Sequence, residues 1–274
     1  MSRLRFDSHQ ASQGRIRPKN RPHKKQVGLA ARGRAVSALG AIRVCFEVLE
    51  DHEVRQKIPY AFKRAVFRAS PALARKLGLD FRLRVPSRMF MEQEVFDYVN
   101  QHFRRGAAAP AARCLFIGLD KHNWHYDRLL DLDFYSIDLN PRNAAYGPPN
   151  RHVVGSATEL SSYYSPNSFD VVFANGLIGF GLDTEEAFNQ LMFECHRVLT
   201  SDGMLVLGYN DKPDRLGFKV EQAAGFQVFK TFEPGIAGMT GASHVVADGF
   251  KHRYVFLRPR RLGLGELGMD LAAA

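Results

Sequence analysis

Three small or polar residues that could contact a nucleotide each follow or end a short apolar run in the middle of the chain. Gly118 follows the first run, and Asp138 ends the second, 20 residues later. A glycine lets a ligand approach the backbone closely, and a carboxylate in the second place can accept hydrogen bonds from both ribose hydroxyls. Asn175 follows a third run. This spacing predicts a site for a ribose-bearing cofactor, with a second substrate meeting it beside Asn175.

The elements that must hold these residues alternate between strands and helices. Compact apolar runs predict strands at residues 114–117, 134–138, 152–154, 169–174 and 204–208, with further strands at 226–232 and 254–257. Helices are predicted at residues 124–130, 185–199 and 216–224. The alternation demands a mostly parallel sheet, and we expect its last strand to form part of an edge hairpin. In such a sheet, ligands bind at the carboxyl ends of the strands.

The predicted fold class is therefore α/β: a doubly wound, Rossmann-like, seven-stranded and mostly parallel sheet with helices on both faces, plus an N-terminal helical cap. We divide the chain into a basic disordered tail (1–35), an N-terminal helical segment (36–105), a ligand-binding domain (106–260) and a flexible C-terminal tail (261–274). The helical segment has its clearest helical stretches at residues 35–50, 54–77 and 90–104. These helices either cap a substrate pocket or only bury one face of the sheet.

The segment 113–211 resembles the core of class I S-adenosyl-L-methionine (SAM)-dependent methyltransferases, in the small-molecule or type 11 group. The pieces that carry the resemblance are CLFIGLD, FYSIDLNP, VVGSATEL, NSFDVVFANGLIGFGLD and CHRVLTSDGMLVLGYND. The most specific part of the resemblance is a combination of two motifs. SFD opens one apolar strand, and RVL followed by DG precedes the next strand. The resemblance covers somewhat more than a third of the chain. It implies that residues 106–260 form a SAM-binding methyltransferase domain.

The same resemblance implies which residues hold the cofactor. They are Gly118, Asp120, Asp138, Leu139, Ser156, Ala157 and Asn175. Gly118 would line the methionine end of SAM, Asp138 would bind the ribose, and Ser156 with Ala157 would contact the adenine. The chain departs from the family at two places, because no second glycine follows Gly118 in the loop and a serine replaces the usual adenine-contacting acid. We expect Asp120 to compensate in part by facing the positive sulfonium or amino group.

The acceptor is expected to be a hydroxyl group of a small molecule or a glycan. No NPPY-type tetrapeptide follows the fourth strand, which argues against a nucleic-acid base amine, and the three glycines of NGLIGFGLD suit a small acceptor. Methyl transfer needs the acceptor atom in line at about 3–3.5 Å, and histidine is the usual base for a hydroxyl. His122 and Asp183 are the first catalytic candidates. The further candidates are His125, His244, His252 and the polar group 209–211.

The positive charge of the chain is concentrated at its start. The formal net charge is +10, but residues 1–35 hold ten Lys and Arg against one Asp, so the remaining 28 basic and 27 acidic residues nearly balance. A nucleic-acid-binding domain would be expected to show a basic face of its own. We therefore expect nucleic acid to make at most weak contact with the basic tail, and the partner to be a small molecule or a sugar.

Composition and cysteine spacing narrow the class of protein. Hydrophobic residues make up 45% of the chain, enough for a sizeable core. No stretch approaches the roughly 18–20 consecutive apolar residues that span a bilayer. Cys45, Cys114 and Cys195 are widely separated, which predicts reduced thiols and neither a disulfide framework nor a metal site. We expect a cytoplasmic protein with no membrane partner and no metal.

Two other functions are open to the same sequence. An NAD-dependent oxidoreductase would keep Asp138 as the ribose ligand, but the chain has no GxGxxG around Gly118 and no Tyr-xxx-Lys pair. A catalytically silent, methyltransferase-like scaffold would use the fold only to bind a partner. The shortened glycine loop keeps the second alternative open, and binding of SAM separates it from an enzyme.

Overall fold

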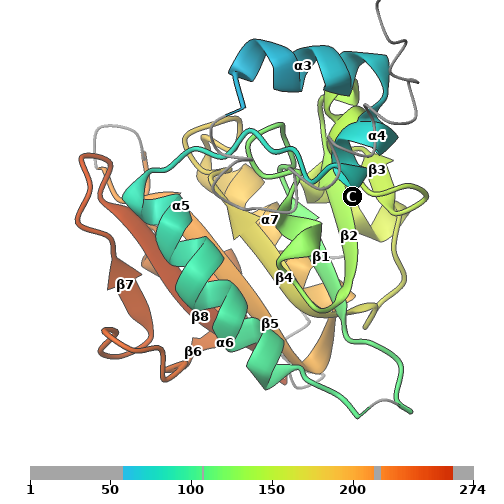
Figure 1. The fold of residues 1–274 in the computed structure, drawn as a ribbon. Coiled ribbons are helices and arrows are strands. Elements are labelled where there is room, and N and C mark those ends of the chain that lie inside the picture. Colours follow the sequence, from blue (N-terminus) through green and yellow to red (C-terminus); the bar gives the residue numbers. More distant parts are fainter. Residues whose placement is uncertain (1–57, 107, 213–216, 262–274) are drawn as a thin grey trace, which may run out of the picture. The chain divides into compact units, whose positions relative to one another are not determined.

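The computed structural model describes residues 58–106, 108–212 and 217–261, which all belong to one unit of the chain, Cys45–Ala274 (Figure 1). The predictions of a basic tail at 1–35, of a helix at 35–50 and of a C-terminal tail fall outside the described residues, except for position 261. The proposed domain boundaries therefore stay predictions.

An eight-stranded sheet forms the centre of the described structure. Its strands are β1 (Arg113–Ile117), β2 (Asp133–Asp138), β3 (His152–Val154), β4 (Phe169–Asn175), β5 (Leu199–Asn210), β6 (Phe229–Thr231), β7 (Ser243–Val245) and β8 (His252–Pro259). They lie in the order β3-β2-β1-β4-β5-β8-β6, and β7 pairs with β8. Strands β1 to β5 pair in parallel, whereas β8 runs antiparallel to its three neighbours. The predicted doubly wound, mostly parallel sheet is confirmed, with β7 as an additional strand.

The order of the strands reverses between β1 and β4. The chain proceeds from β1 outward through β2 to β3, and then returns to the other side of β1 to form β4 and β5. Loops on the two sides of this point leave the sheet in opposite directions and open a crevice at the carboxyl ends of the strands. The crevice lies where Gly118, Asp138 and Asn175 end or follow their strands.

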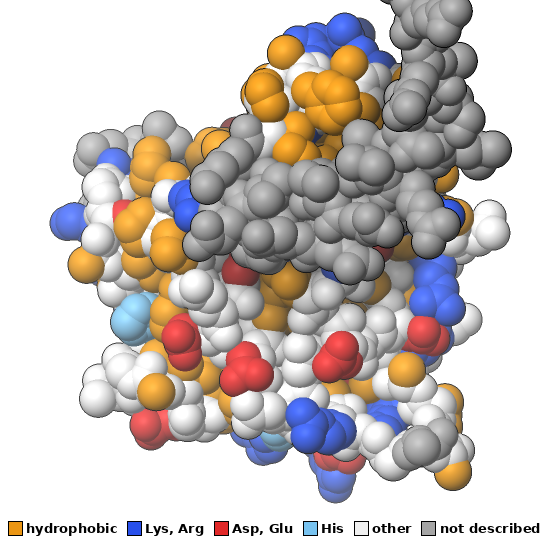
Figure 2. Space-filling view, in the orientation of Figure 1, with side chains coloured by type: hydrophobic (Ala, Val, Ile, Leu, Met, Phe, Trp, Pro, Cys, Tyr) orange, Lys and Arg blue, Asp and Glu red, His pale blue; other side chains and the backbone are white. Residues whose placement is uncertain are grey.

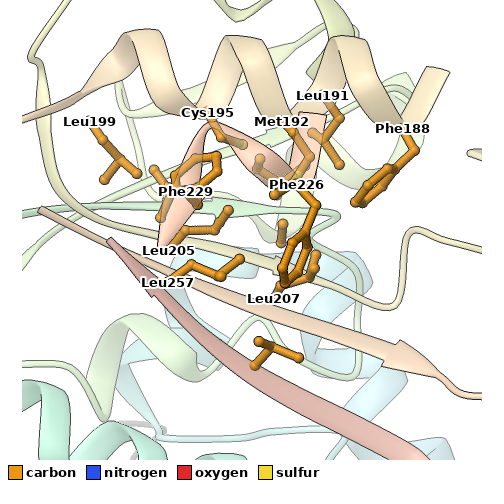
Figure 3. Packing of buried hydrophobic residues seen from close by; sticks show 14 of the residues in the cluster. Phe188, Leu191, Met192, Cys195, Leu199, Leu205, Leu207, Phe226, Phe229 and Leu257 are labelled. Atoms are coloured by element: carbon orange, nitrogen blue, oxygen red, sulfur yellow. The ribbon is translucent and has the colours of Figure 1, made fainter. Parts of the chain in front are cut away.

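One face of the sheet is covered by helix α7 (Glu185–Val198), and Figure 3 shows how its apolar side chains meet those of the strands. Phe188, Leu191 and Cys195 pack in one buried cluster with alternate strand residues such as Leu205 and Leu207. Thr184 begins the helix, since its side chain accepts a hydrogen bond from the Ala187 backbone. The predicted helix at 185–199 is confirmed except for its last residue, which begins β5.

The opposite face is covered by the described part of the N-terminal segment. Helix α5 (Pro86–Phe90), the π-helical turn η1 (Met91–Val95) and helix α6 (Phe96–His102) follow one another in front of β4, β5 and β8 in Figure 1. Val95, Phe96 and Val99 pack against the other alternate strand residues, among them Phe116 and Phe173. The N-terminal helices were expected either to cap a substrate pocket or to bury one face of the sheet. Helices α5 and α6 bury a face of the sheet.

Helices α3 (Tyr60–Ala69) and α4 (Pro71–Lys76) form a third, smaller cluster. Phe67 and Ala74 pack there with Trp124, which belongs to the loop after β1. These two helices thus lie beside the loop that leaves the carboxyl end of β1. None of the described helices has both the length and the apolar character that crossing a membrane requires.

The predicted helix at 124–130 is wrong, because only a short 3₁₀ turn, η2 (Tyr126–Arg128), forms there. Side chains replace the helical hydrogen bonds just before it: the Asn123 side chain accepts from the Asp120 N–H at 2.6 Å, and the Asp120 carboxylate accepts from the His122 N–H at 2.8 Å. Asn and Asp side chains that bond to nearby backbone in this way compete with a helix.

Two predictions near residues 216–257 also need correction. The described part of the predicted helix at 216–224 holds only the 3₁₀ turn η5 (Val220–Gln222), and helix α8 (Ala224–Gln227) takes the start of the predicted strand at 226–232. Gly225 lies so close to α7 that a Cβ would be 2.7 Å from the Asn189 Cα, so packing on α7 sets this segment. Strand β8 lies between β5 and β6, and it also pairs in antiparallel register with the preceding strand β7, which agrees with the expected edge hairpin.

Candidate functional site

A cavity of about 280 Å³ opens at the carboxyl ends of β1 and β2. It lies at the reversal of strand order, where ligands bind in sheets of this kind. Five of the seven residues predicted to bind the cofactor line it: Gly118, Asp138, Leu139, Ser156 and Ala157. The loop after β4 supplies the facing wall, with Leu177, Phe180, Gly181 and Leu182.

Gly118 is held in a conformation that other residues adopt rarely. Its φ is +85°, and a Cβ at this position would be 2.9 Å from Cδ2 of Leu177. The backbone angle therefore strongly favours glycine, and a Cβ here would also displace the end of the Leu177 side chain. The loop after β4 thus comes down directly onto the end of β1, and any ligand at this place shares it with Leu177.

One of the two carboxylate oxygens of Asp138 accepts hydrogen bonds from within the protein. Its Oδ1 accepts from the Asn140 backbone N–H at 2.7 Å and from Nδ2 of Asn143 at 3.0 Å. Among the described residues, no hydrogen bond reaches Oδ2. The turn after β2 therefore fixes the direction of the carboxylate, and the second oxygen can accept from a ribose hydroxyl in the cavity.

Two apolar side chains at the cavity are left open to solvent. Leu139 is 74% exposed and Phe180 is 62% exposed, although both are large and hydrophobic. Isolated exposed apolar residues are common, but two that line the same concave site mark a place for an apolar ring. Both side chains line the cavity together with Asp138, so one ligand could contact the apolar side chains and the carboxylate at the same time.

Ser156 mainly shapes the part of the cavity wall that follows β3. Its Oγ accepts from the Thr158 backbone N–H at 3.2 Å and lies 2.7 Å from Oγ1 of Thr158, at the start of the 3₁₀ turn η4 (Ala157–Ser162). The hydroxyl is thus engaged in holding the turn, and this turn places Ala157 at the cavity.

Asn175 takes part in a hydrogen-bonded group at the ends of β4, β5 and β8. Its Oδ1 lies 2.8 Å from Nε2 of His252, and Nδ1 of the same ring lies 2.8 Å from Oδ1 of Asn210. Gly208 makes room for this group, because a Cβ there would be 1.9 Å from the Asn175 Oδ1. His252, one of the further candidates, is therefore the histidine that the structure brings to Asn175.

The His252 ring is neutral in the folded protein. It is only 7% exposed, and burial lowers its pKa to about 4, with Asp248 opposing the shift and the Arg88 guanidinium adding to it. A neutral ring carries one N–H, so one of the two amides meets it with oxygen and the other with its NH₂ group. The ring thereby couples the orientations of the Asn175 and Asn210 amides.

His122 and Asp183 lie apart from the smaller cavity. Nδ1 of His122 lies 2.9 Å from the Phe81 carbonyl oxygen and donates to it, which leaves Nε2 as the acceptor. His122 lines a second, larger cavity. Asp183 is exposed and accepts from the Gly181 backbone N–H at 3.4 Å. Asp120 lines neither cavity, and its carboxylate holds the turn at His122.

The other candidates from the sequence have structural partners. His125 is buried with Nε2 3.1 Å from Oε1 of Glu92, and burial lowers its pKa. The His244 ring stacks on Phe90 at 4.4 Å between centroids. The Tyr209 hydroxyl donates to Glu221 at 2.9 Å. Asp211 pairs with Arg253 at 2.6 Å, so the polar group 209–211 is engaged within the protein.

No sequence motif singles out Arg88, on helix α5. Its charge acts on the Tyr126 and Tyr254 phenols and on the His252 ring. The Tyr254 hydroxyl donates to the Ser87 carbonyl at 2.9 Å and ties α5 to β8. Arg88 thus adds a cation near the Asn175 group, and within the described parts of the chain no carboxylate pairs with it. Only the packing of α5 across the sheet reveals this position.

The family model described as "Methyltransferase domain" matches residues 122–207. The match includes Asp138, Ser156 and Asn175, and it begins four residues after Gly118. The sheet order and this match resemble those of a class I, SAM-dependent methyltransferase domain, and S-adenosyl-L-methionine is the cofactor that such a domain implies. A search of curated proteins gave no match.

The solved structures that match this chain share little sequence with it. The PH0226 protein from Pyrococcus horikoshii OT3 has 12% identity and a TM-score of 0.47, over 64% of this chain and 91% of its own. A TehB-like SAM-dependent methyltransferase from Corynebacterium glutamicum has 16% identity and a TM-score of 0.43, over 74% and 100%. The [4+2]-cyclase SpnF has 13% identity and a TM-score of 0.45, over 64% and 83%.

The residues present at the smaller cavity fit the nucleoside part of SAM. They offer an acceptor oxygen on Asp138, exposed apolar walls at Leu139 and Phe180, and at Gly118 a backbone of positive φ without a side chain. The volume of about 280 Å³ is just below the usual range of about 300–1,000 Å³ for ligand sites, so it matches the nucleoside rather than the whole cofactor.

Proposed function

We propose that the protein is an active methyltransferase that moves a methyl group from SAM to a small-molecule or glycan acceptor, at a hydroxyl group. The observation that carries the proposal is the cavity at the reversal of strand order, with the Asp138 carboxylate beside two exposed apolar walls. A carboxylate at the end of the second strand is the group that binds ribose hydroxyls in folds of this kind.

The residues of the smaller cavity would hold the cofactor. Asp138 accepts from the ribose hydroxyls, Leu139 and Ala157 contact the adenine, and Gly118 lets the methionine part pass the end of β1. Ser156 holds the turn that carries Ala157. Asn175 adds a polar group at the end of β4, and Asp120 would place negative charge in the loop between the cavities. These roles extend the contacts described above and stand as proposals.

When bound, SAM supplies a methyl carbon whose bond to sulfur breaks as a bond to the acceptor oxygen forms, with S-adenosylhomocysteine as the other product. The chain must align the acceptor and receive the hydroxyl proton. We propose His122 as the group that receives the proton, because donation from Nδ1 to the Phe81 carbonyl leaves Nε2 able to accept. Asp183 is the second proposed group, at the start of α7 and open to solvent.

One observation favours a second candidate function, a methyltransferase-like scaffold that binds a partner without catalysis. The connection between β1 and β2 holds no long helix, and Leu177 lies against Gly118 where the methionine part of SAM would pass. In this case the nucleoside cavity would be retained without productive placement of the methyl donor.

Two free and buried thiols, Cys114 and Cys195, support a reducing compartment as part of the proposal. The cytoplasm is such a compartment. On the face drawn in Figure 2, the described acidic and basic side chains are interspersed, which supports a small-molecule acceptor rather than nucleic acid.

Calorimetry with SAM and with S-adenosylhomocysteine tests the cofactor site. We expect saturable binding by the full chain and at least a tenfold loss of affinity in Asp138→Ala, because the ribose loses its acceptor. Asp131→Ala is the matched control, since this aspartate is exposed in the loop between β1 and β2. An absence of heat with both ligands would contradict the enzyme, and binding without methyl transfer to any metabolite or saccharide pool would favour the scaffold.

A further inference from the structure

The larger cavity has a volume of about 560 Å³, within the usual range for small-molecule sites. Its walls come from α3, from the segment 78–84 and from the loop after β1, where His122 and Leu129 line it. Gly118 lines the smaller cavity and His122, four residues later, lines the larger one. The two cavities therefore meet the same loop from different sides.

The lining of the larger cavity is strongly basic. Its charged residues are four cations, Lys63, Arg82, Arg84 and Arg128, and one anion, Asp80. Asp80 lies 3.9 Å from the Lys63 ammonium and 2.9 Å from Nε of Arg82, and Glu92 accepts from Arg82 at 3.3 Å. Two carboxylates thus form ion pairs with Lys63 and Arg82, whereas Arg84 and Arg128 form no ion pair in the described part of the chain.

Among the described residues, neither Arg84 nor Arg128 forms an ion pair, although the Asp127 and Asp80 carboxylates act on Arg128 from a greater distance. Arg84 is exposed and forms no ion pair there. Arg128 donates to the carbonyls of Leu79 at 3.3 Å and Arg75 at 3.5 Å, and its guanidinium lies 5.3 Å from the centre of the Trp124 ring. The nearby Asp127 is engaged with Arg75. Two guanidinium groups at one cavity favour a phosphate or carboxylate, which they can bind through paired hydrogen bonds.

Aromatic rings and a histidine also line the larger cavity, at Tyr60, Phe81 and His122. The Tyr60 and Phe81 rings meet edge to face at 5.6 Å, and the Phe81 carbonyl holds His122 by its Nδ1. A molecule in this cavity would therefore meet cations, an aromatic wall and the acceptor nitrogen of the proposed base. We propose that the larger cavity binds the methyl acceptor, and that this acceptor carries a phosphate or carboxylate group held by Arg84 and Arg128. The acceptor role rests on the proposed function above.

Trp124 provides a direct measurement of binding. It is the only tryptophan of the chain, it is buried, and both Arg75 and Arg128 lie over its ring. The full chain is titrated with glucose 6-phosphate, succinate and glucose at constant ionic strength while tryptophan fluorescence is recorded. We expect a saturable change with glucose 6-phosphate or with succinate and none with glucose. Which of the two anions binds shows whether the cavity takes a phosphate or a carboxylate. Saturation with glucose alone, or with none of the three compounds, overturns the proposal.

A pair of charge reversals locates the site. Arg84→Glu should weaken binding of the anion at least tenfold, whereas Arg104→Glu should leave it unchanged, because Arg104 is exposed and lines neither cavity. Circular dichroism checks that both variants fold. Equal binding in the two variants overturns the assignment to the larger cavity.

The same variants separate this inference from the proposed function. Asp138→Ala should lose SAM binding and keep anion binding, whereas Arg84→Glu should do the reverse. Release of S-adenosylhomocysteine from SAM with a pool of phosphorylated and carboxylated metabolites should fall at least tenfold in Arg84→Glu. Anion binding without SAM binding contradicts the proposed function alone. SAM binding without anion binding contradicts this inference alone.

Discussion

The His252 ring lies between the amides of Asn175 and Asn210, at the ends of three strands. Its burial disfavours the charged ring, which is why its pKa falls to about 4. An unfolded chain would protonate this histidine near pH 6.5. Between these two pH values the unfolded state binds a proton that the folded state does not, so acid must weaken the fold through this residue.

We expect His252 to make folding stability depend on pH. The stability contribution is fully present above about pH 6.5 and is lost as the pH falls toward about 4, with a total of about 3 kcal/mol. Urea unfolding at pH 7, 5.5 and 4.5 measures it. His252→Gln keeps hydrogen-bonding groups without titrating, so the free energy of unfolding should fall less steeply in the variant. Parallel pH dependence in both proteins would show that another group is responsible.

The position of His252 next to Asn175 could not be predicted from the sequence. The two residues are 77 positions apart, and they meet only because β8 pairs with β5 in antiparallel register. Asp138 and Gly118 could be predicted, since a residue at the end of an apolar run marks the mouth of a parallel sheet. The positions of Phe180 and Leu177 at the cavity could not be predicted, because the path of a loop depends on the residues it packs against.

The elements differ in how well the sequence predicts them. Buried parallel strands appear as short apolar runs, and β1 to β4 were predicted to within one residue at each end. Helix α7 was predicted because its apolar stripe is long. The short turns at 124–130 and 220–227 depend on side-chain hydrogen bonds and on close packing, which local propensity does not contain.

The meeting of β1 with the loop after β4 can be tested at Gly118. We expect Gly118→Ala to lower the free energy of unfolding by about 1–2 kcal/mol, since alanine is strained at φ +85° and its Cβ meets Leu177. SAM affinity in calorimetry should fall at least tenfold. Gly106→Ala is the control, because nothing lies within 4 Å of a Cβ there. Unchanged SAM binding in Gly118→Ala would place the cofactor away from the end of β1.

The molecule depends on burial of both faces of the sheet. Alternate residues of the central strands β1, β4, β5 and β8 pack in a cluster with α7 on one side and in a cluster with η1 and α6 on the other. The helical segment before β1 is thus a structural layer of the same core, in addition to any part that lines a cavity. A segment that only capped the site would contribute little to the stability of the sheet.

Matched truncations on the two faces test this arrangement. Phe188→Ala on α7 and Phe96→Ala on α6 should each cost about 3–5 kcal/mol of unfolding free energy, because both rings are fully buried. Phe193→Ala should cost far less, since this ring on α7 is 43% exposed. Urea unfolding with a single probe measures all three. A small loss in Phe96→Ala alone would mean that the N-terminal helices do not share the core.

The place of β8 has a consequence for the order in which the chain can fold during synthesis. Strands β1 to β5 are made first and can pair with one another, but β5 faces empty space until residues 252–259 have emerged. During that interval Leu205, Val206 and Leu207 lie on an unpaired edge, the kind of surface on which nascent chains associate. A chain that terminated before position 252 would therefore be an aggregation-prone fragment, although all of the proposed cofactor-binding residues would already have been made.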